Sequence, residues 1–485
     1  MENQALKKNM AWGFQGRREE FGWRRSRREE PMERRYVNIK LEKATREEIL
    51  NLQFRRLKEL LERAYHTNSF YRDLYRKHNV TPDDINSLGD FRRKIPYITK
   101  KDLLKDQDQF PPYGSRLGIP KNEVALSSLT SGTSGIGQEV HPASSFDVEA
   151  SSTGFIWQCR WAGLDPFDRL FIMNLIGLPL GGLWILRGAE KYLLQHFQVG
   201  PDDSLKRLKL MKRFSPHCFI AVPAYLNRLS FLAEENGYDS KRDFPDLKVI
   251  LTATEAYTLS WLHKMEAFWG TRIFEWYGST QAAGSHMFSC ENGVYDHNDH
   301  RCILHNLEHR VLVEVLDRNT GDPVRSGEEG EIYVTVLFRQ AFPSIRFKTE
   351  DRAKFMDYNE CDCGRPFAGI EAGTIARYDD MIKMKAVNVW PEAVDAIIFS
   401  ISDIEEYNGK VWIDEKGREQ VSVMVEFKTK CSLSLVERTA LLEKISGEIR
   451  DNIGVSMLLK EVAYGSLPHF EYKPRRWTDD RHKSI

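Results

Sequence analysis

Apolar and polar positions follow two different periods along the chain. Apolar residues recur every three or four positions from Thr45 to about Lys77, which predicts helix over that stretch. Short apolar runs separated by helical spans come later, and they predict buried strands near residues 170–175, 217–223 and 247–253. Strands that alternate with helices favour an α/β architecture with a largely parallel sheet.

A second pattern occupies residues 310–355. Two runs dense in β-branched and apolar residues, 311–316 and 330–336, flank the turn Asn319-Thr320-Gly321-Asp322-Pro323. Paired runs of this kind on either side of a Gly- and Pro-containing turn are typical of antiparallel strands. We therefore expect a β-rich subdomain that follows the α/β region.

The length of the chain bears on its domain organisation. At 485 residues it is too long for one compact core, so we expect more than one domain. We predict an Arg/Glu-rich leader over residues 1–40, a large domain over 41–376 and a small C-terminal domain over 377–485. The mixed charges of the leader indicate a solvated tail or an exposed helix, and docking on a partner subunit is the alternative.

Charge and cysteine content narrow the class of protein. Seventy basic residues balance seventy acidic ones, so no global field attracts nucleic acid or a membrane surface. The chain has no apolar run of membrane-spanning length and no apolar core of a signal peptide at its start. Seven cysteines, an odd number in a large chain, fit reduced thiols or a metal site better than a disulfide framework. We expect a cytoplasmic protein.

A Ser/Thr-rich loop with two glycines follows a short apolar run at Val124-Ala125-Leu126. The loop residues singled out are Thr130, Ser131, Gly132, Thr133, Ser134 and Gly135. Glycines let backbone amides approach an anion closely, and hydroxyls add short donors, so the loop can wrap a triphosphate. It is not a Walker loop, because no Gly-Lys-Ser/Thr follows. An ordinary Ser/Thr-rich hairpin is the alternative.

Further motifs follow this loop in a fixed order. They are LTATEAYT at 251–258, WYGSTQ at 276–281, RFKTED at 346–351 and RYDDMIK at 377–383, which continues as VNVWP at 387–391. Together with the loop, this ordered set resembles the adenylate-forming (acyl-CoA synthetase) superfamily, most closely its phenylacetate-CoA ligase branch. The resemblance spans about residues 45–480.

The resemblance implies a fold and a reaction. The fold is a large N-terminal α/β domain with a β-rich subdomain, plus a small mobile α+β C-terminal domain. The reaction is the ATP-dependent activation of an aryl or small carboxylic acid to an acyl-adenylate, followed by transfer to the thiol of CoA, with ATP, Mg²⁺ and CoA as cofactors. Transfer to a carrier protein or an amine, and a non-catalytic nucleotide-binding subunit, stay open as alternatives. The candidate assembly is a homodimer.

Site residues carry over from the matching motifs. The catalytic candidates are Lys473, Thr280 and Gln281, and the hinge candidate is Asp379. Besides the loop, the nucleotide-binding candidates are Thr254, Glu255, Ala256, Tyr277, Gly278, Ser279, Asp351, Arg377 and Asn388. The chemistry is consistent with this: Tyr277 offers an aromatic face to adenine, and the Asp351 carboxylate can accept both hydroxyls of a ribose. A lysine such as Lys473 can neutralise a carboxylate that approaches a phosphate.

The chain also departs from the family pattern. Ile136 stands where a lysine is usual, Gln281 replaces a Mg²⁺-associated glutamate, and Ala386 replaces a glycine. These changes bear on the rate of adenylation and on the identity of the acceptor. Gly181, Gly182 and Trp184 match the start of the acid-pocket helix, where an indole would fill volume and favour a small or flat acid. A core tryptophan is the alternative.

Two cysteines on a tight turn, Cys361-Asp362-Cys363-Gly364, form a knuckle suited to Zn²⁺. Some members of the phenylacetate-CoA ligase branch carry zinc there, completed by an upstream Cys and a His. The candidate ligands are Cys290, His305, Cys361 and Cys363, with His297 and Cys302 as alternatives to His305. A Cys₃His site would be structural, because no position is left open. Reduced, unliganded cysteines are the other interpretation.

Overall fold

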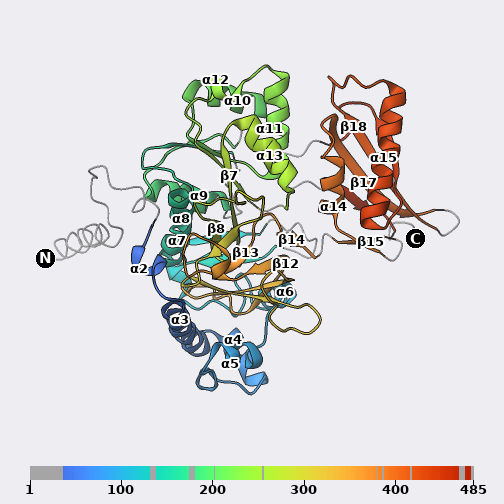
Figure 1. Ribbon diagram of the computed structural model, residues 1–485. Coiled ribbons are helices and arrows are strands. Elements are labelled where there is room, and N and C mark those ends of the chain that lie inside the picture. The colour runs from blue at the N-terminus through green and yellow to red at the C-terminus, as the bar shows by residue number, and fades with distance from the viewer. Residues whose placement is uncertain are drawn as a thin grey trace.

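The computed structural model describes residues 36–130, 138–173, 181–200, 202–253, 256–378, 381–384, 387–414, 418–468 and 476–481. Figure 1 shows a large body built from the N-terminal three quarters of the chain and a smaller C-terminal body beside it. This arrangement confirms the predicted fold class.

The predicted N-terminal helix forms but is divided in two. α3 (Arg46–Thr67) begins at Thr45, whose side chain and that of Glu48 form a reciprocal capping box. The helix ends at Asn68, which caps the next helix, α4 (Ser69–Lys77), by accepting a hydrogen bond from the backbone of Tyr71. Because Asn68 serves both helices and is fully buried, the turn is fixed there. Three helices flank this pair: α2 (Ile39–Glu42), α5 (Leu88–Lys94) and α6 (Lys100–Gln109).

A 12-stranded sheet forms the centre of the large body. Its parallel part runs in the order β4-β3-β5-β6-β7. These strands are β3 (Arg169–Ile172), β4 (Gln195–Gln198), β5 (Cys218–Ile220), β6 (Val249–Ala253) and β7 (Arg272–Ser279). The three strands predicted from apolar runs are thereby confirmed as β3, β5 and β6. The helices of this region are α8 (Gly154–Trp161), α9 (Gly181–Lys191), α10 (Ser204–Phe214), α11 (Pro223–Glu235), α12 (Ser240–Asp243) and α13 (Leu259–Trp269).

The β-rich stretch predicted for residues 310–355 is also confirmed, as an antiparallel extension of the same sheet. From β7 the sheet continues through β8 (Gly284–Ser289), β9 (Ile303–Asn306), β13 (Gly369–Glu371), β12 (Phe347–Met356), β11 (Glu329–Val336) and β10 (Val311–Leu316). A short strand, β14 (Ala376–Arg377), pairs with β12. Outside this sheet, β1 (Leu126–Leu129) and β2 (Val140–Ala143) form an antiparallel hairpin that leads into α7 (Ser145–Ser152).

The C-terminal body has a core of its own. A four-stranded sheet in the order β19-β18-β17-β20 packs with two helices around buried residues such as Tyr407, Val423 and Ile445. The elements are β15 (Ile382–Met384), β16 (Val387–Val389), α14 (Pro391–Ile398), β17 (Ile404–Ile413), β18 (Glu419–Phe427), α15 (Leu435–Ile453), β19 (Leu458–Val462) and β20 (Trp477–Asp479). Arg476, directly before β20, is buried and its Nε lies 2.6 Å from Glu406 Oε1.

The two bodies meet along α11, which faces the C-terminal body in Figure 1. Arg228 on this helix donates a hydrogen bond to Glu405 Oε1 at 3.0 Å, and Lys430 Nζ donates to the backbone oxygen of Glu235 at 3.2 Å. Burial raises the pKa of Glu405 to about 7, against the opposing effect of Arg228. The contact is therefore polar and sensitive to pH near neutrality.

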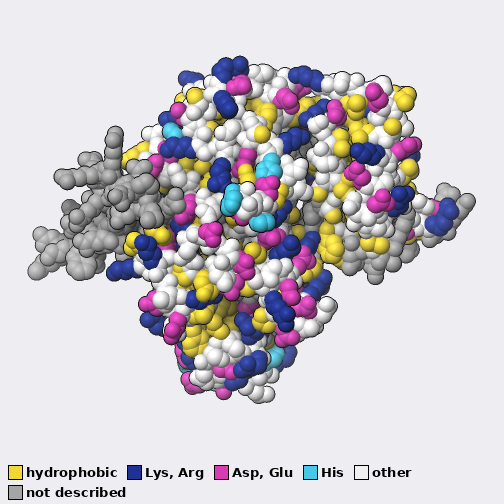
Figure 2. Space-filling model, viewed as in Figure 1, with side chains coloured by type: hydrophobic (Ala, Val, Ile, Leu, Met, Phe, Trp, Pro, Cys, Tyr) yellow, Lys and Arg dark blue, Asp and Glu magenta, His cyan; other side chains and the backbone are white. Residues whose placement is uncertain are grey.

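The surface shows mixed charge. Figure 2 shows Lys and Arg side chains interspersed with Asp and Glu over the face in view, as the balanced composition predicts. Among the described residues, no helix has the length and apolar character needed to cross a bilayer.

Candidate active site

Three segments that are far apart in the chain meet beyond the carboxyl end of β7. Tyr277, near the end of that strand, donates a hydrogen bond from its hydroxyl to Asp351 Oδ2 at 2.6 Å. Arg377 on β14 lies opposite Asp351 in the β12–β14 register, and its Nε is 3.7 Å from Asp351 Oδ1. The structure thus brings together the three residues that sequence reasoning assigned to adenine and ribose.

Tyr277 differs from the open platform expected for adenine. Its side chain is only 4% exposed, and its ring meets the ring of His286 edge-on at a centroid distance of 5.5 Å. Burial raises the pKa of Tyr277 well above its usual value, so the hydroxyl stays a neutral donor. The geometry therefore gives Tyr277 one clear role, which is to orient the carboxylate of Asp351.

The ends of the Ser/Thr-rich loop are joined through Thr130 and Glu139. The backbone N–H of Thr130 donates to the carbonyl of Glu139 at 3.0 Å, and the N–H of Glu139 donates to Thr130 Oγ1 at 2.9 Å. Gln138 Nε2 also donates to the Thr130 carbonyl, at 3.1 Å. These bonds extend the β1–β2 ladder by one residue pair, and they thereby close the base of the loop.

The turn after β7 reaches this loop base through a side chain. Gln281 Nε2 donates to both carboxylate oxygens of Glu139, at 2.9 and 3.1 Å. The carbonyl of Thr280 accepts a hydrogen bond from Arg339 Nη1 at 3.3 Å. Gln281 and Thr280 therefore stand where the strand end, the loop base and the segment around residue 339 meet.

Glu139 itself was missed at the level of the sequence. It is fully buried, and His141 Nε2 donates to its Oε2 at 2.8 Å. Burial lowers the pKa of His141 to about 4, so the imidazole is neutral at pH 7. Burial alone would raise the pKa of Glu139, but the hydrogen bond from His141, the charge of Arg116 and the hydrogen bond from Gln281 outweigh it and hold that pKa below its usual value. The available signal in the sequence was an acidic residue directly before the apolar strand β2.

Trp184 lies against the turn that carries Gln281. It lies two positions after Gly182, in the first turn of α9 (Gly181–Lys191), and is 7% exposed. A Cβ placed on Gly284, at the start of β8, would lie 3.2 Å from the indole ring. Gly284 has φ of +110°, so both its conformation and the contact with Trp184 favour glycine. The indole consequently packs against the start of β8, beside the turn that carries Gln281.

A second buried carboxylate supports the segment that follows β6. Tyr257, next to Ala256, donates from its hydroxyl to Glu275 Oε2 at 2.6 Å, and the N–H of Gly373 donates to the same oxygen at 2.7 Å. Burial raises the pKa of Glu275 to about 7. Glu275 thereby ties the predicted adenine segment to the strand that carries Tyr277, a role that the motif comparison did not assign.

Other predicted residues lie outside the described part of the chain. These are Ser131, Gly132, Thr133, Ser134, Gly135, Thr254, Glu255, Asp379 and Lys473, together with the side chain of Asn388. Gly278 and Ser279 complete β7, and the Ser279 hydroxyl accepts a hydrogen bond from the backbone of Ala282 at 3.1 Å.

The predicted cysteine and histidine ligands converge. One ligand atom from each of Cys290, His305, Cys361 and Cys363 lies within 4.8 Å of the others. The sulfur atoms of Cys290 and Cys361 are 3.7 Å apart, and Cys363 Sγ is 3.3 Å from His305 Nε2. Zinc–sulfur bonds of ~2.3 Å at tetrahedral angles place two sulfur atoms about 3.8 Å apart. The group therefore fits a tetrahedral Zn²⁺ ion.

The surroundings of His305 support the same fit. The ring is buried, and its Nδ1–H donates to the backbone oxygen of Phe367 at 2.7 Å, which leaves Nε2 to face the cysteines. The alternatives considered for the histidine, His297 and Cys302, do not belong to the group of four in the part of the chain described here.

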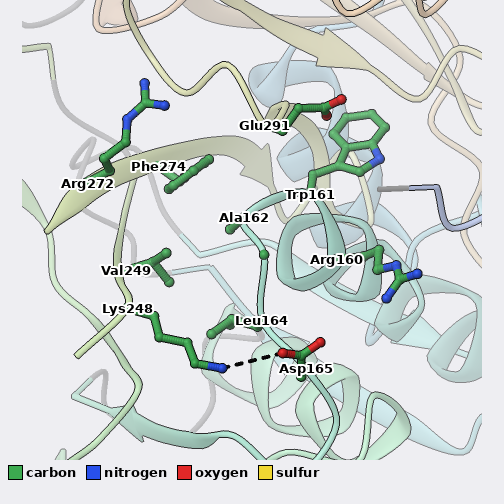
Figure 3. Close-up of a pocket in the computed structure, with 11 residues that line it drawn as sticks. Arg160, Trp161, Ala162, Leu164, Asp165, Lys248, Val249, Arg272, Phe274 and Glu291 are labelled. Atoms are coloured by element: carbon green, nitrogen blue, oxygen red, sulfur yellow. Dashed lines mark hydrogen bonds and ion pairs between the residues drawn. The ribbon is translucent and has the colours of Figure 1, made fainter. Parts of the chain in front are cut away.

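A cavity of about 400 Å³ opens at the amino ends of the parallel strands, opposite the candidate site (Figure 3). Lys248, Val249 and Arg272 from the amino ends of β6 and β7 line it, together with Trp161. Lys248 Nζ lies 2.9 Å from the carboxylate of Asp168. Ligands of open α/β sheets bind beyond the carboxyl ends of the strands, so this cavity is not the predicted nucleotide site.

Comparison with known proteins identifies the family of the chain. The family described as AMP-binding enzyme matches residues 171–336, and the AMP-binding enzyme C-terminal domain matches residues 386–481. A phenylacetate-coenzyme A ligase of Thermus thermophilus is 28% identical over 446 residues, covering 89% of this chain and 96% of that protein. One from Escherichia coli is 26% identical over 448 residues, covering 91% and 97%.

The structural comparison points the same way. A crystal structure of 2-hydroxyisobutyryl-CoA ligase, in the postadenylation state in complex with 2-HIB-AMP, superposes with a TM-score of 0.84 at 22% identity and covers 94% of each chain. At that identity the likeness establishes the fold, while the matches in sequence establish the relationship. The chain belongs to the adenylate-forming superfamily of AMP-binding enzymes, in its phenylacetate-CoA ligase-like branch.

Proposed function

We propose that this enzyme activates a small or aryl carboxylic acid with ATP and transfers the acyl group to CoA. The observation that carries the proposal is the meeting of Tyr277, Asp351 and Arg377 from three distant segments, beside the closed base of the Ser/Thr-rich loop. Relatives named phenylacetate-coenzyme A ligase support the choice of CoA as acceptor.

In this proposal the nucleotide lies across the carboxyl ends of the parallel strands. The Asp351 carboxylate, oriented by the Tyr277 hydroxyl, accepts the ribose hydroxyls, and Arg377 adds a donor to ribose or phosphate. The segment at Thr254, Glu255 and Ala256 borders adenine. Amides and hydroxyls of residues 130–135 hold the β- and γ-phosphates.

The first step joins the acid to AMP. A carboxylate oxygen of the substrate attacks the α-phosphorus, the bond from that phosphorus to the bridging oxygen breaks, and pyrophosphate leaves. Lys473 neutralises the charges that approach one another. Mg²⁺, when bound, screens the phosphates, and the amide oxygen of Gln281 and the hydroxyl of Thr280 are the donors this turn can offer to it.

The second step uses the small domain, which we propose begins near Arg377. Rotation about Asp379 removes Lys473 from the site and presents a new face near Asn388 to the acyl-adenylate. The thiol sulfur then attacks the acyl carbonyl, the bond to phosphate oxygen breaks, and AMP leaves.

The acid is small or flat in this proposal, because Trp184 occupies volume beside the turn at Gly284. Zn²⁺ is proposed as a structural ion on Cys290, His305, Cys361 and Cys363, since the tetrahedral group uses every ligand position. A cytoplasmic location and a homodimer stay predictions.

Pyrophosphate exchange into ATP, measured with a panel of small aliphatic and aromatic acids, tests the first step. We expect exchange that depends on one class of acid. Thioester formation on adding CoA then tests the acceptor. Exchange without a thioester would favour a carrier protein or an amine, and ATP binding without exchange under any acid would favour a non-catalytic nucleotide-binding subunit.

A further inference from the structure

We propose that Glu139 is a positioning residue that fixes the orientation of the Gln281 amide, so that Gln281 offers its carbonyl oxygen, not its NH₂ group, to Mg²⁺–ATP. This inference rests on the proposed function and deepens it. It concerns a residue that neither the motifs nor the comparisons with relatives single out.

The direction of each hydrogen bond in this group follows from chemistry. An ionised carboxylate only accepts, so the atom of Gln281 that faces Glu139 must be the nitrogen, at 2.9 and 3.1 Å. For the same reason the ring nitrogen of His141 that faces Glu139, at 2.8 Å, must carry a proton. The amide orientation is therefore dictated by its partner.

The other side of His141 gives the same answer independently. Arg339 can only donate, and its Nη2 lies 3.3 Å from His141 Nδ1, so this nitrogen must be the acceptor and Nε2 the donor. Arg339 and His141 are each 1% exposed, and Glu139 is fully buried. Hydrogen bonds are thus donated in one direction, from Arg339 to His141 and from His141 to the carboxylate of Glu139. Gln281 donates to the same carboxylate.

The position of Glu139 at the base of the Ser/Thr-rich loop explains why the orientation of the Gln281 amide matters. The backbone of Glu139 is hydrogen-bonded to Thr130 across the base of the Ser/Thr-rich loop, so its side chain joins that base to the turn after β7. With the nitrogen of Gln281 held by Glu139, the oxygen on the same carbon must face another way. An amide oxygen is a neutral ligand that a hard cation accepts, whereas an NH₂ group repels a cation.

The pair also keeps a negative charge in place. The resemblance assigns a glutamate to position 281, and this chain has a glutamine there with a buried carboxylate directly behind it, at position 139. Side chains that orient a metal ligand from behind tune its affinity strongly, and their removal typically costs about 10- to 100-fold.

The test is ATP affinity, measured by calorimetry without acid, once with Mg²⁺ and once with EDTA. Glu139→Gln preserves the shape but lets residue 139 donate, so the Gln281 amide can reverse. We expect about tenfold weaker ATP binding with Mg²⁺ and less than about twofold change with EDTA. Glu308→Gln, which removes a buried carboxylate held by Arg46 away from the site, is the matched control and should change neither value.

Two further variants keep the result decisive. Gln281→Met removes the oxygen from a half-buried side chain and should show the same loss with Mg²⁺. The double variant Glu139→Gln with Gln281→Glu places a carboxylate at 281, which needs no orientation, and should recover the Mg²⁺ dependence.

Each outcome has a separate meaning. Wild-type protein that binds ATP in neither condition would contradict the proposed function itself. Wild-type binding combined with an unchanged Mg²⁺ dependence in Glu139→Gln, or with equal losses in Mg²⁺ and EDTA, would contradict the positioning role. A double variant as impaired as Glu139→Gln would contradict it as well.

Discussion

The nucleotide site and the Cys/His group sit at opposite ends of one hairpin and are built differently. β7 carries Tyr277 of the nucleotide site, and β8 runs back to Cys290, which belongs to the Cys/His group. The Cys/His group consists of four side chains whose ligand atoms already converge. The proposed nucleotide site instead joins the side chains of Tyr277, Asp351 and Arg377, which come from β7, β12 and β14.

This difference teaches where rigidity is useful in such an enzyme. A tetrahedral Zn²⁺ site, as proposed for this group, would fix the far end of the hairpin and leave no position for chemistry. The proposed mechanism requires the nucleotide site to exchange partners between two half-reactions. Its residues Asp351 and Gln281 are held by hydrogen bonds with Tyr277 and Glu139.

Removal of the Asp351 carboxylate should give the largest effect on the nucleotide side. Asp351→Ala loses the two charge-assisted bonds to ribose, so we expect pyrophosphate exchange to fall about 100-fold, at roughly 1.5 kcal/mol per bond. Melting temperature should change little. Tyr277→Phe, which keeps the carboxylate but not its orienting donor, should lose about tenfold. Equal exchange rates in Asp351→Ala and the wild type would remove Asp351 from the site.

Loss of one cysteine should lower the melting temperature and leave pyrophosphate exchange nearly unchanged, the reverse of the Asp351 result. In Cys361→Ser we expect zinc content, measured by mass spectrometry of the purified protein, to fall about tenfold or more, together with a lower melting temperature. Exchange per folded molecule should stay close to that of the wild type. Cys302→Ser is the control, because Cys302 lies outside the group of four. Wild-type protein without zinc would overturn the assignment.

Trp184→Gly should widen the range of acids that the enzyme accepts. Removing the indole beside Gly284 opens space, and differences of one or two methylenes in such pockets are worth roughly 10-fold. We therefore expect the ratio of kcat/KM for a bulkier acid to that for a small acid to rise about tenfold. An unchanged acid profile would place Trp184 in the core only.

The contact between the two bodies should give the smallest effect, and it depends on pH. Burial raises the pKa of Glu405 from 4.5 to about 7, so the docked form takes up a proton in this window. Docking is then favoured as pH falls from 7 toward 4.5 and weakened as pH rises through 7. The protection factors of α11 amides, in which the intrinsic pH dependence of exchange has been divided out, should be larger at pH 6 than at pH 8. Glu405→Gln should abolish this difference, and a persistent difference would exclude Glu405 as its source.

Much of the fold could be predicted from the sequence, because its signals are local. Apolar runs marked β3, β5 and β6, and the turn at 319–323 marked the antiparallel strands. The division of the first helix at Asn68 was missed, since the apolar spacing continues across it and only the capping side chain marks the break.

The site was predictable where a residue's chemistry is visible in the chain. Asp351 lies against Tyr277, and Cys290, His305, Cys361 and Cys363 converge, as the motifs led us to expect. Glu139, His141 and Glu275 were missed because their roles arise from tertiary contacts between strands and loops. The motif alone could not distinguish an open adenine platform from a core position for the Tyr277 ring, since burial depends on the packing of neighbours such as His286.

The buried guanidinium of Arg476 has a consequence for how the last part of the chain works. It is bound to Glu406 and lies 3.5 Å from Asp395, and β20 follows it as an edge strand parallel to β17. Lys473 precedes this anchor by only three positions. A protein truncated before Arg476 would keep Lys473 but lose the ion pair with Glu406 and the strand β20, so the proposed role of Lys473 predicts that such a truncation lowers activity.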